Sequence, residues 1–356
     1  MKKRLAIIGC GGIGSYHLGH FLQYGDIIDM VGFCDLIRER AEGFAEKAGC
    51  GEVFTDYVEM LDTLKPDIVF VCIPPYCHGD VERNLIKRGI HFFVEKPVAL
   101  DMALAKEIRD SIKEHNIITG CGFQCRYSKL VEPNRAFVDN NEIVYVECAR
   151  MGGIPGTDWW ADKKLSGGQI VEQTVHQFDI IRYMMGEPET VFTMNTKGFV
   201  KNGPANYDTD DLTTTVVKFK SGVLASISTG CYVTGGNAFD SKVTFSTKDK
   251  RADLRILDKF EVFGEKPAAP DENKQGGFVI SNDGGVASAS GDSIIYREEG
   301  DAGLLCDRTF IEGVIAGDGS KVRSPYEDAV KTLAFVLACN KSIDTGLPVN
   351  VDDMLA

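Results

Sequence analysis

A glycine-rich segment near the N-terminus constrains the fold more than any other feature of the sequence. Four apolar residues, Leu5 to Ile8, predict a buried strand, and residues 13 to 24 have the character of a helix. Gly9, Gly11 and Gly14 span the junction of strand and helix with the G-x-G-x-x-G spacing. In this motif the first glycine allows a tight turn, the second lets a pyrophosphate approach the backbone, and the third lets the helix pack on the strand. The helix N-terminus then faces the phosphates. The segment predicts dinucleotide binding, with a plain glycine turn in an α/β core as the alternative.

Strand-like and helix-like segments alternate over the first 121 residues. We predict strands at 27–34, 67–73, 91–94 and 117–121, and helices at 36–48, 57–64, 81–88 and 102–115. Repeated units of this length are typical of an α/β fold with a doubly wound parallel sheet and helices on both faces. Ligands bind at the carboxyl ends of such strands, so Gly14, Asp35, Pro74 and Glu95–Pro97 should line one crevice.

Beyond Cys121 strands dominate. We predict helices at 129–138, 168–185, 304–316 and 326–340, strands at 143–151, 190–200, 212–219, 223–233, 241–246 and 254–262, and a polar surface loop at 267–291. The sequence therefore predicts two domains. Residues 1–121 form the nucleotide-binding domain, and residues 122–356 form an α+β domain with a mostly antiparallel open sheet.

Charge and cysteine usage exclude several classes of function. The net charge of −13 over 356 residues argues against a nucleic-acid or membrane partner, because both require a basic surface. No apolar run approaches the length of a spanning helix, and the N-terminal one is too short for a secretion signal, so we expect a cytoplasmic protein. The eleven cysteines are scattered, and the closest pairs lack C-x-x-C spacing, so we predict reduced thiols and no metal site.

Asp35 follows the second predicted strand, 21 residues after Gly14. A carboxylate at this place hydrogen-bonds the adenosine ribose hydroxyls and repels a 2′-phosphate, which favours NAD over NADP. Arg38 lies close enough in sequence to neutralise Asp35 or to bind a phosphate. The alternative role for Asp35 is that of a helix N-cap.

Lys96 follows the apolar strand 91–94 directly, between Glu95 and Pro97. A lysine at a strand end above a cofactor crevice is partly desolvated, and desolvation lowers the pKa of an ammonium group toward the working range of an acid/base. The alternative is an ordinary solvated lysine.

A second group of titratable residues follows Gly167 and Gly168. Glu172, His176 and Asp179 have the spacing i, i+4, i+7 and are predicted to share one face of the helix 168–185. Carboxylates beside a histidine fix its tautomer and stabilise its imidazolium, as a proton-transfer group for an alcohol requires. A structural histidine is the alternative.

The order and spacing of these motifs resemble the Gfo/Idh/MocA oxidoreductase family. The resemblance covers nearly the whole chain and also takes in Pro74 with His78. It implies a Rossmann domain, a second domain whose sheet often forms the interface of a homodimer or homotetramer, and NAD(P)-dependent oxidation of a secondary alcohol on a sugar, glycoside or cyclitol. Lys96 matches the family's catalytic lysine and His176 its catalytic histidine. Arg126 lies where related enzymes place a basic residue near the substrate.

Two departures from the family pattern concern the site. Glu172 stands where the family often has Asp, and Ile73-Pro74-Pro75 stands where it often has Thr-Pro-Asn. In the resulting hypothesis, Glu172 orients His176, and His176 or Lys96 exchanges the hydroxyl proton. The residues predicted to contact the cofactor are Gly9, Gly11, Gly12, Ile13, Gly14, Asp35, Arg38, Pro74, His78, Glu95 and Lys96.

The loop before Gly167 supplies further candidates for substrate binding. Asp158 and the adjacent pair Trp159 and Trp160 precede the double glycine. Paired tryptophans can stack on a sugar face, and the equal alternative is that they anchor the loop in the protein interior. Tyr232 is a weaker candidate of the same kind, and Lys96, Arg126 and His176 complete the predicted substrate contacts.

The family resemblance also leaves two alternative functions open. The chain could be an NAD-dependent glycoside hydrolase that uses transient oxidation, or a non-catalytic sugar or NAD sensor. Retention of both the lysine and the histidine argues against the sensor.

Overall fold

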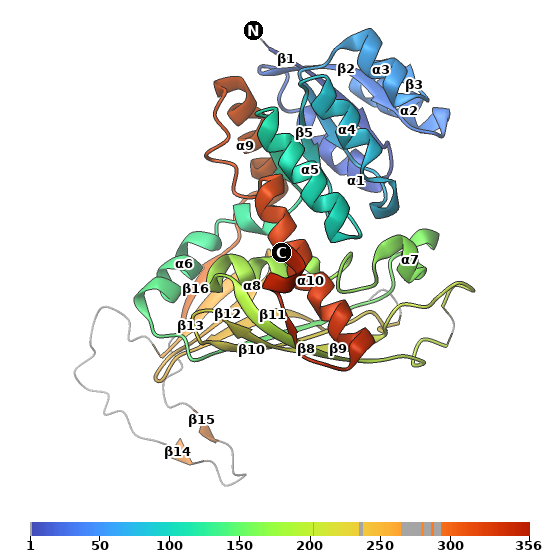
Figure 1. Ribbon diagram of the computed structural model, residues 1–356. Helices are drawn as coiled ribbons and strands as arrows, with labels where there is room; N and C mark the ends of the chain where they lie inside the picture. The colour runs from blue at the N-terminus through green and yellow to red at the C-terminus, as the bar shows by residue number, and fades with distance from the viewer. Residues whose placement is uncertain (1, 202, 235–237, 265–278, 281–285, 288–292) are drawn as a thin grey trace, which may run out of the picture.

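The computed structural model describes residues 2–356 except 202, 235–237, 265–278, 281–285 and 288–292. Two sheets with their helices lie one above the other, as Figure 1 shows. The N-terminal sheet and its helices lie at the top, and the second sheet lies below, with α8 and α10 on the side that faces the first. The helices of the second part therefore lie between the two sheets.

The first sheet is parallel throughout and has six strands in the order β3-β2-β1-β4-β5-β6. This confirms the predicted doubly wound sheet. The order reverses beside β1, which is where ligands bind in folds of this kind. Its strands are β1 (Lys3–Ile8), β2 (Ile28–Cys34), β3 (Glu52–Phe54), β4 (Ile68–Val71), β5 (His91–Val94) and β6 (Thr119–Cys121). Its helices are α1 (Gly12–Phe21), α2 (Arg38–Ala48), α3 (Tyr57–Leu64), α4 (Asp80–Lys87) and α5 (Met102–Glu114).

The second sheet has nine strands in the order β16-β13-β12-β11-β7-β10-β9-β8-β17. All neighbours are antiparallel except β7 and β10, so the predicted mostly antiparallel sheet is confirmed. The strands are β7 (Tyr145–Met151), β8 (Pro188–Thr196), β9 (Leu212–Phe219), β10 (Leu224–Gly230), β11 (Asp240–Ser246), β12 (Arg251–Arg255), β13 (Lys259–Phe263), β16 (Ser293–Arg297) and β17 (Val349–Asn350). The strand predicted at 254–262 is wrong: it is the hairpin of β12 and β13, which turns at Leu257 with a φ of +58°.

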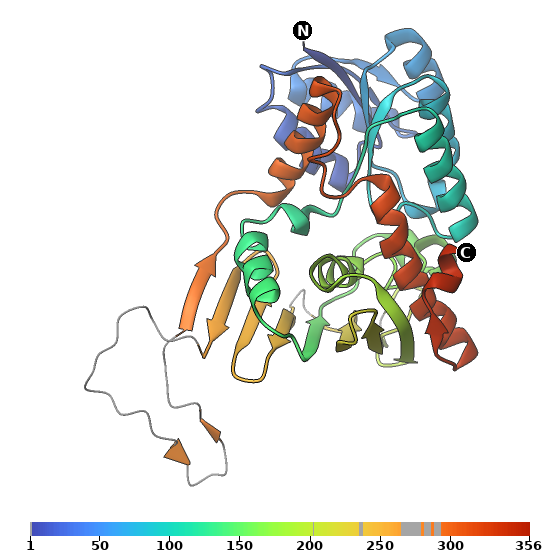
Figure 2. The same ribbon diagram turned by 60° about the vertical axis from the view of Figure 1, so that its left-hand side comes forward.

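Helices cover one face of this sheet, as Figure 2 shows from the side. They include α6 (Val131–Asn140), α8 (Val175–Met185) and α10 (Tyr326–Thr345). Along β9 the odd-numbered residues Thr213 to Phe219 are buried and Thr214, Val216 and Lys218 are exposed, so the other face of the sheet is open in this chain.

The helix predicted at 168–185 begins only at Val175, because the chain passes through Gly167 and Gly168, with φ of +78° and +86°, and then a turn.

The remaining described elements are short, apart from α9 (Ala302–Ala316), which the sequence predicted at 304–316. They are the 3-10 helices η1 (Pro75–Cys77), η2 (Gln124–Tyr127) and η3 (Asp158–Ala161), the helices α7 (Lys163–Ser166) and α11 (Asp352–Leu355), and the paired strands β14 (Val279–Ile280) and β15 (Val286–Ala287). Most of the loop predicted at 267–291 lies outside the described residues. Among the described helices, none is both long and apolar enough to cross a membrane.

Helix α9 follows the second sheet in sequence but packs on the first. The ring centre of Phe310 lies 5.7 Å from the ring centres of both Phe70 and Phe93. The Tyr24 hydroxyl donates a hydrogen bond of 2.6 Å to the carbonyl of Leu304. The proposed boundary near residue 121 thus leaves one later helix in the core of the first half.

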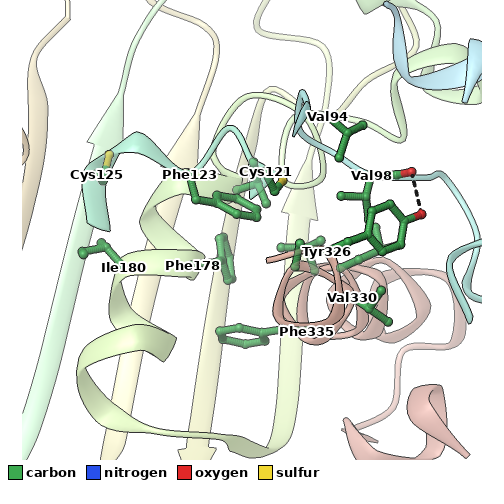
Figure 3. Packing of buried hydrophobic residues seen from close by; sticks show 14 of the residues in the cluster. Val94, Val98, Cys121, Phe123, Cys125, Phe178, Ile180, Tyr326, Val330 and Phe335 are labelled. Carbon is green, nitrogen blue, oxygen red and sulfur yellow. Dashed lines mark hydrogen bonds between the residues drawn. The ribbon is translucent and has the colours of Figure 1, made fainter. Parts of the chain in front are cut away.

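A second core joins the two halves along α8 and α10 (Figure 3). Phe178 of α8 lies edge-on to Phe335 of α10, with 5.1 Å between ring centres. At its other end α10 reaches the segment after β5, where the Tyr326 hydroxyl donates a hydrogen bond of 3.4 Å to the carbonyl of Val98. Burial of these residues fixes the distance between the end of β5 and the start of α8.

Replacing Phe310 with Ala tests whether α9 is part of the first core. Phe310 is fully buried between aromatic rings, and removal of such a side chain costs about 3–5 kcal/mol of unfolding free energy. Urea denaturation should show this loss. Leu305→Ala, on the exposed side of the same helix, should change stability by less than about 0.5 kcal/mol. Equal effects of the two variants would contradict the packing described.

Candidate active site

The glycine loop is built for a ligand that approaches the backbone closely. Gly9 has a φ of +94°, and a Cβ there would lie 2.2 Å from the carbonyl oxygen of Cys72. A Cβ at Gly14 would lie 2.3 Å from the carbonyl oxygen of Gly9, so strand and helix pack without side chains. At Gly11 and Gly12 a Cβ would meet no atom within 4 Å. No side chain caps α1 at Gly11, so its first N–H groups are available for a pyrophosphate, and the loop fits a dinucleotide.

Asp35 lies at the end of β2 beside this loop. Its Oδ2 accepts a hydrogen bond of 2.8 Å from the Cys10 N–H, and its Oδ1 accepts one of 2.9 Å from the Ile37 N–H. Ile37, and not Asp35, is the N-cap of α2. Arg38 is exposed and pairs with Glu42 at 2.9 Å, so it does not neutralise Asp35 in this structure. The ribose contact predicted for Asp35 stays a prediction that this geometry supports.

Pro74 and His78 follow β4 and flank the two ends of η1. The His78 Nδ1 lies 2.7 Å from Glu82 Oε1, and its Nε2 is buried with no hydrogen-bond partner among the described residues. A buried nitrogen without a partner is costly, and a ligand group at the crevice would relieve that cost. The cofactor contacts predicted for these residues and for the 38% exposed Ile13 stay predictions.

Lys96 pairs with Glu172 across the two halves of the chain. The Lys96 Nζ donates hydrogen bonds of 2.8 Å to Glu172 Oε1 and 3.0 Å to the Glu172 carbonyl. Burial lowers the pKa of the ammonium group, but the carboxylates of Glu172 and Glu95 outweigh it, and the pKa of Lys96 is raised above its ordinary value. The predicted lowering of this pKa is wrong, because the sequence does not reveal the ion pair. Lys96 carries its proton at neutral pH.

His176, in the first turn of α8, is neutral, in contrast to the charged Lys96. Burial and, to a smaller extent, the positive charges of Lys96 and Arg150 together lower its pKa to about 3. Its Nδ1 is buried and has no hydrogen-bond partner among the described residues. The ring is therefore neutral and able to accept a proton.

The structure separates the two carboxylates that were predicted to flank His176. Glu172 lies in the turn before α8 and binds Lys96, and Asp179 accepts hydrogen bonds of 2.8 and 2.5 Å from Arg126. The prediction that Glu172, His176 and Asp179 share one helical face is wrong, since α8 begins only at Val175. A neutral imidazole replaces the stabilised imidazolium that we predicted.

Arg126 is only 1% exposed and serves as a link between elements. Its guanidinium binds Asp179 of α8, Asp328 of α10 at 2.5 Å and the carbonyl of Arg323 at 2.7 Å. Its carboxylate partners occupy the places that a substrate would need. This geometry gives Arg126 a structural role, and the predicted substrate contact has no support from it.

The other predicted substrate contacts lie on two segments. Trp160 is fully buried, which favours the alternative of a loop anchor over sugar stacking. Asp158 is exposed at the start of η3, and its carbonyl accepts a hydrogen bond of 3.2 Å from Asn206. Tyr232 is half-buried just after β10. Contacts of Asp158 and Tyr232 with substrate remain predictions.

Behind Glu95 lies a buried chain of titratable groups that sequence reasoning missed. The His17 Nε2 lies 3.1 Å from Glu95 Oε1 and its Nδ1 lies 2.7 Å from Asp307 Oδ2, which also lies 2.7 Å from His20 Nδ1. Burial lowers the pKa of His17, but Asp307 and Glu95 outweigh it and raise the pKa to about 10. The contacts run in a line from His20 through Asp307 and His17 to Glu95, and they hold the Glu95 carboxylate in place next to Lys96. Because Asp307 is 290 residues from His17 in the chain, no local pattern could have revealed the contact.

Replacing His17 with Gln should destabilise the protein in a pH-dependent way. The pKa of His17 is about 10 in the folded state and near 6.5 when unfolded, so the stabilisation is complete below about pH 6.5 and is lost as the pH rises through 10. The difference in melting temperature between wild type and variant should be largest near pH 6 and shrink toward pH 10. His115→Gln, at an exposed histidine, is the control. A difference that is constant with pH would contradict a charged His17.

Two family models match the chain. One, described as "Oxidoreductase family, NAD-binding Rossmann fold", matches residues 3–123, and the other, "GFO/IDH/MocA C-terminal domain", matches residues 141–268. The myo-inositol 2-dehydrogenase of Thermotoga maritima is 24% identical over 357 residues, 99% of each chain. The D-glucoside 3-dehydrogenase of Escherichia coli is 29% identical over 245 residues, 64% of this chain and 69% of that one.

Solved structures share the complete fold. An oxidoreductase from Thermotoga maritima superimposes with a TM-score of 0.81 at 19% identity, covering 99% of this chain and 100% of the other. The WlbA dehydrogenase of Bordetella pertussis, in complex with NADH and UDP-GlcNAcA, gives a TM-score of 0.78 at 17% identity, covering 98% and 99%. At these identities the likeness shows the fold.

Proposed function

Since the chain belongs to the Gfo/Idh/MocA family of oxidoreductases with an NAD-binding Rossmann fold, we propose that it is an NAD-dependent dehydrogenase that oxidises a secondary hydroxyl of a sugar, glycoside or cyclitol. The observation that carries this proposal is the pair of opposite protonation states at Lys96 and His176. A charged lysine beside a neutral histidine supplies both groups that removal of a proton from an alcohol requires.

In the proposed reaction His176 accepts the hydroxyl proton. Lys96 donates a hydrogen bond to the same substrate oxygen and stabilises the negative charge that develops on it. Glu172 keeps Lys96 protonated and fixes the position of the Lys96 Nζ. This role of Glu172 replaces the predicted one, in which Glu172 orients His176. In the reverse direction the protonated His176 returns the proton to the oxygen.

Residues of the first sheet would hold the cofactor. NAD, when bound, supplies the acceptor for the hydride of the alcohol carbon. The N–H groups at Gly11 and Gly12 would bind its pyrophosphate, and the carboxylate of Asp35 would bind its ribose hydroxyls and disfavour a 2′-phosphate.

The similarity to known dehydrogenases supports this class of substrate. They include dehydrogenases of myo-inositol and of D-glucosides, and neither relative is a glycoside hydrolase by name. Cytoplasmic location and a homodimer or homotetramer stay predictions.

Lys96→Met and His176→Asn test the proposed roles. Each should lower kcat by about 100-fold or more, because each removes one partner of the proton transfer. NADH formation over a panel of sugars, glycosides and cyclitols measures the rates, and the NAD affinity of His176→Asn should change little. Lys164→Met, at an exposed lysine, is the matched control. Full turnover by either variant would overturn the assignment, and glycoside hydrolysis without NADH accumulation would support the hydrolase instead.

Asp35→Ser tests the preference for NAD. Loss of the carboxylate removes both the ribose contact and the repulsion of a 2′-phosphate. The ratio of kcat/KM for NAD to that for NADP should fall by about 10-fold or more, which corresponds to one charge-assisted hydrogen bond. Arg38→Ala is informative beside it, because Arg38 pairs with Glu42 and should leave the ratio nearly unchanged. An unchanged ratio in Asp35→Ser would argue against the proposed ribose contact.

A further inference from the structure

Arg150 projects toward the catalytic segment from the end of β7. On this strand Val146 and Cys148 are buried under the helices, and Arg150 continues the same alternation. Its partner in register on β10 is Thr229, and residues in register on neighbouring strands point to the same side of a sheet.

Thr229 contacts the segment that carries the catalytic residues. Its hydroxyl lies 3.3 Å from the Thr174 hydroxyl, and its carbonyl accepts a hydrogen bond of 3.0 Å from Gln169 Nε2. Glu172 lies between these two residues, and His176 follows them. The side chain of Arg150 therefore lies on the face of the sheet where this segment packs.

The partners of Arg150 are poor for a guanidinium. Its Nη1 lies 3.3 Å from the carbonyl oxygen of Gly230 and 3.4 Å from Cys231 Sγ. Among the residues that the structure describes, no carboxylate lies within ion-pair distance of Arg150. Arg126 and Arg182, by contrast, each bind two carboxylates.

Electrostatic effects place Arg150 beside the catalytic groups. Its charge contributes to the low pKa of His176. Burial raises the pKa of Cys231, Arg150 opposes this rise, Glu172 adds to it, and the resulting pKa is about 11, so Cys231 is within reach of both charges. Glu172 is paired with Lys96 and forms no ion pair with Arg150.

A half-buried guanidinium without a counter-charge is costly, and an anion that reaches it would gain a strong, charge-assisted contact. There is no side chain at Gly152 to cover the group: a Cβ there would lie 2.9 Å from Arg150 Cζ. The phosphates of a dinucleotide do not explain the charge, because the glycine loop that fits them belongs to the first sheet and Arg150 to the second.

We propose that the substrate of this site carries a negatively charged group, a carboxylate or a phosphate, and that Arg150 binds it. This inference rests on the proposed dehydrogenase function and narrows its substrate class to acidic sugars or cyclitols. Arg150 acts as a specificity determinant, whereas Lys96 and His176 carry out the proton transfer.

Matched substrates test the inference. NADH formation is measured for glucose, glucuronate and glucose 6-phosphate, and for myo-inositol and inositol 1-phosphate, with wild type, Arg150→Met and Arg150→Lys. Wild type should prefer an acidic member over its neutral counterpart. Arg150→Met should raise KM for that acidic substrate by about 10- to 100-fold, with a smaller change for the neutral one, and Arg150→Lys should recover part of the loss. Comparison of the carboxylate and phosphate members identifies the anion.

Arg255→Met is the control, because Arg255 is an exposed arginine on the same sheet, and its kinetics should match wild type. Equal use of neutral and acidic substrates, or an Arg150→Met variant that affects both equally, would overturn the inference and leave the dehydrogenase proposal intact. Equilibrium binding of the same compounds to the NADH-loaded protein separates the two proposals. Acidic compounds that bind in an Arg150-dependent way without turnover would support the anion site and contradict the dehydrogenase, and absence of any such binding would overturn the anion site.

Discussion

The ion pair between Lys96 and Glu172 is the interaction on which the site depends. It joins the end of β5 in the first sheet to the turn before α8, 76 residues later. Inside a protein an ion pair is favourable only when geometry and further hydrogen bonds offset desolvation, and here the Glu172 carbonyl supplies a second acceptor at 3.0 Å. The pair keeps Lys96 charged, and that charge in turn favours the neutral form of His176.

Two further buried networks support the elements that carry this pair. On one side His17 and Asp307 hold Glu95 against the backbone that carries Lys96, and Gly122 leaves the space that the Glu95 carboxylate fills. On the other side Arg126 ties α8 to α10 through Asp179 and Asp328. Removal of one partner from such a network leaves an uncompensated buried charge, so the first network restrains α1 and α9 against the end of β5, and the second restrains α8 against α10.

The sequence predicts what depends on local pattern. The parallel sheet follows from alternating apolar and amphipathic segments, and the glycine loop follows from steric demands at Gly9 and Gly14 that the structure shows directly. The sequence also brought Lys96 and Glu172 into one candidate site, although not as a pair.

The errors arise where long-range contacts decide. A helix from Gly168 agreed with the spacing of Glu172, His176 and Asp179, but contacts with Lys96 and Arg126 draw the two carboxylates in different directions. The sequence predicts the wrong direction for the pKa of Lys96 for the same reason: desolvation follows from local pattern, whereas the counter-charge of Lys96 comes from another element. The sequence also gives no sign of a role for Arg150, because that role depends on which side chains surround it in the folded protein.

The balance of charge in the site also argues for the direction of proton transfer. Two cations, Lys96 and Arg150, lie near His176, whereas the carboxylate of Glu172 is turned toward the lysine. A proton placed on His176 is therefore disfavoured until negative charge enters the site. An acidic substrate group on Arg150 would supply part of that charge, and the alkoxide forming at the substrate oxygen would supply the rest. The site would thus become competent to hold the proton on His176 only when a substrate is bound, which couples recognition by Arg150 to the chemistry at Lys96 and His176.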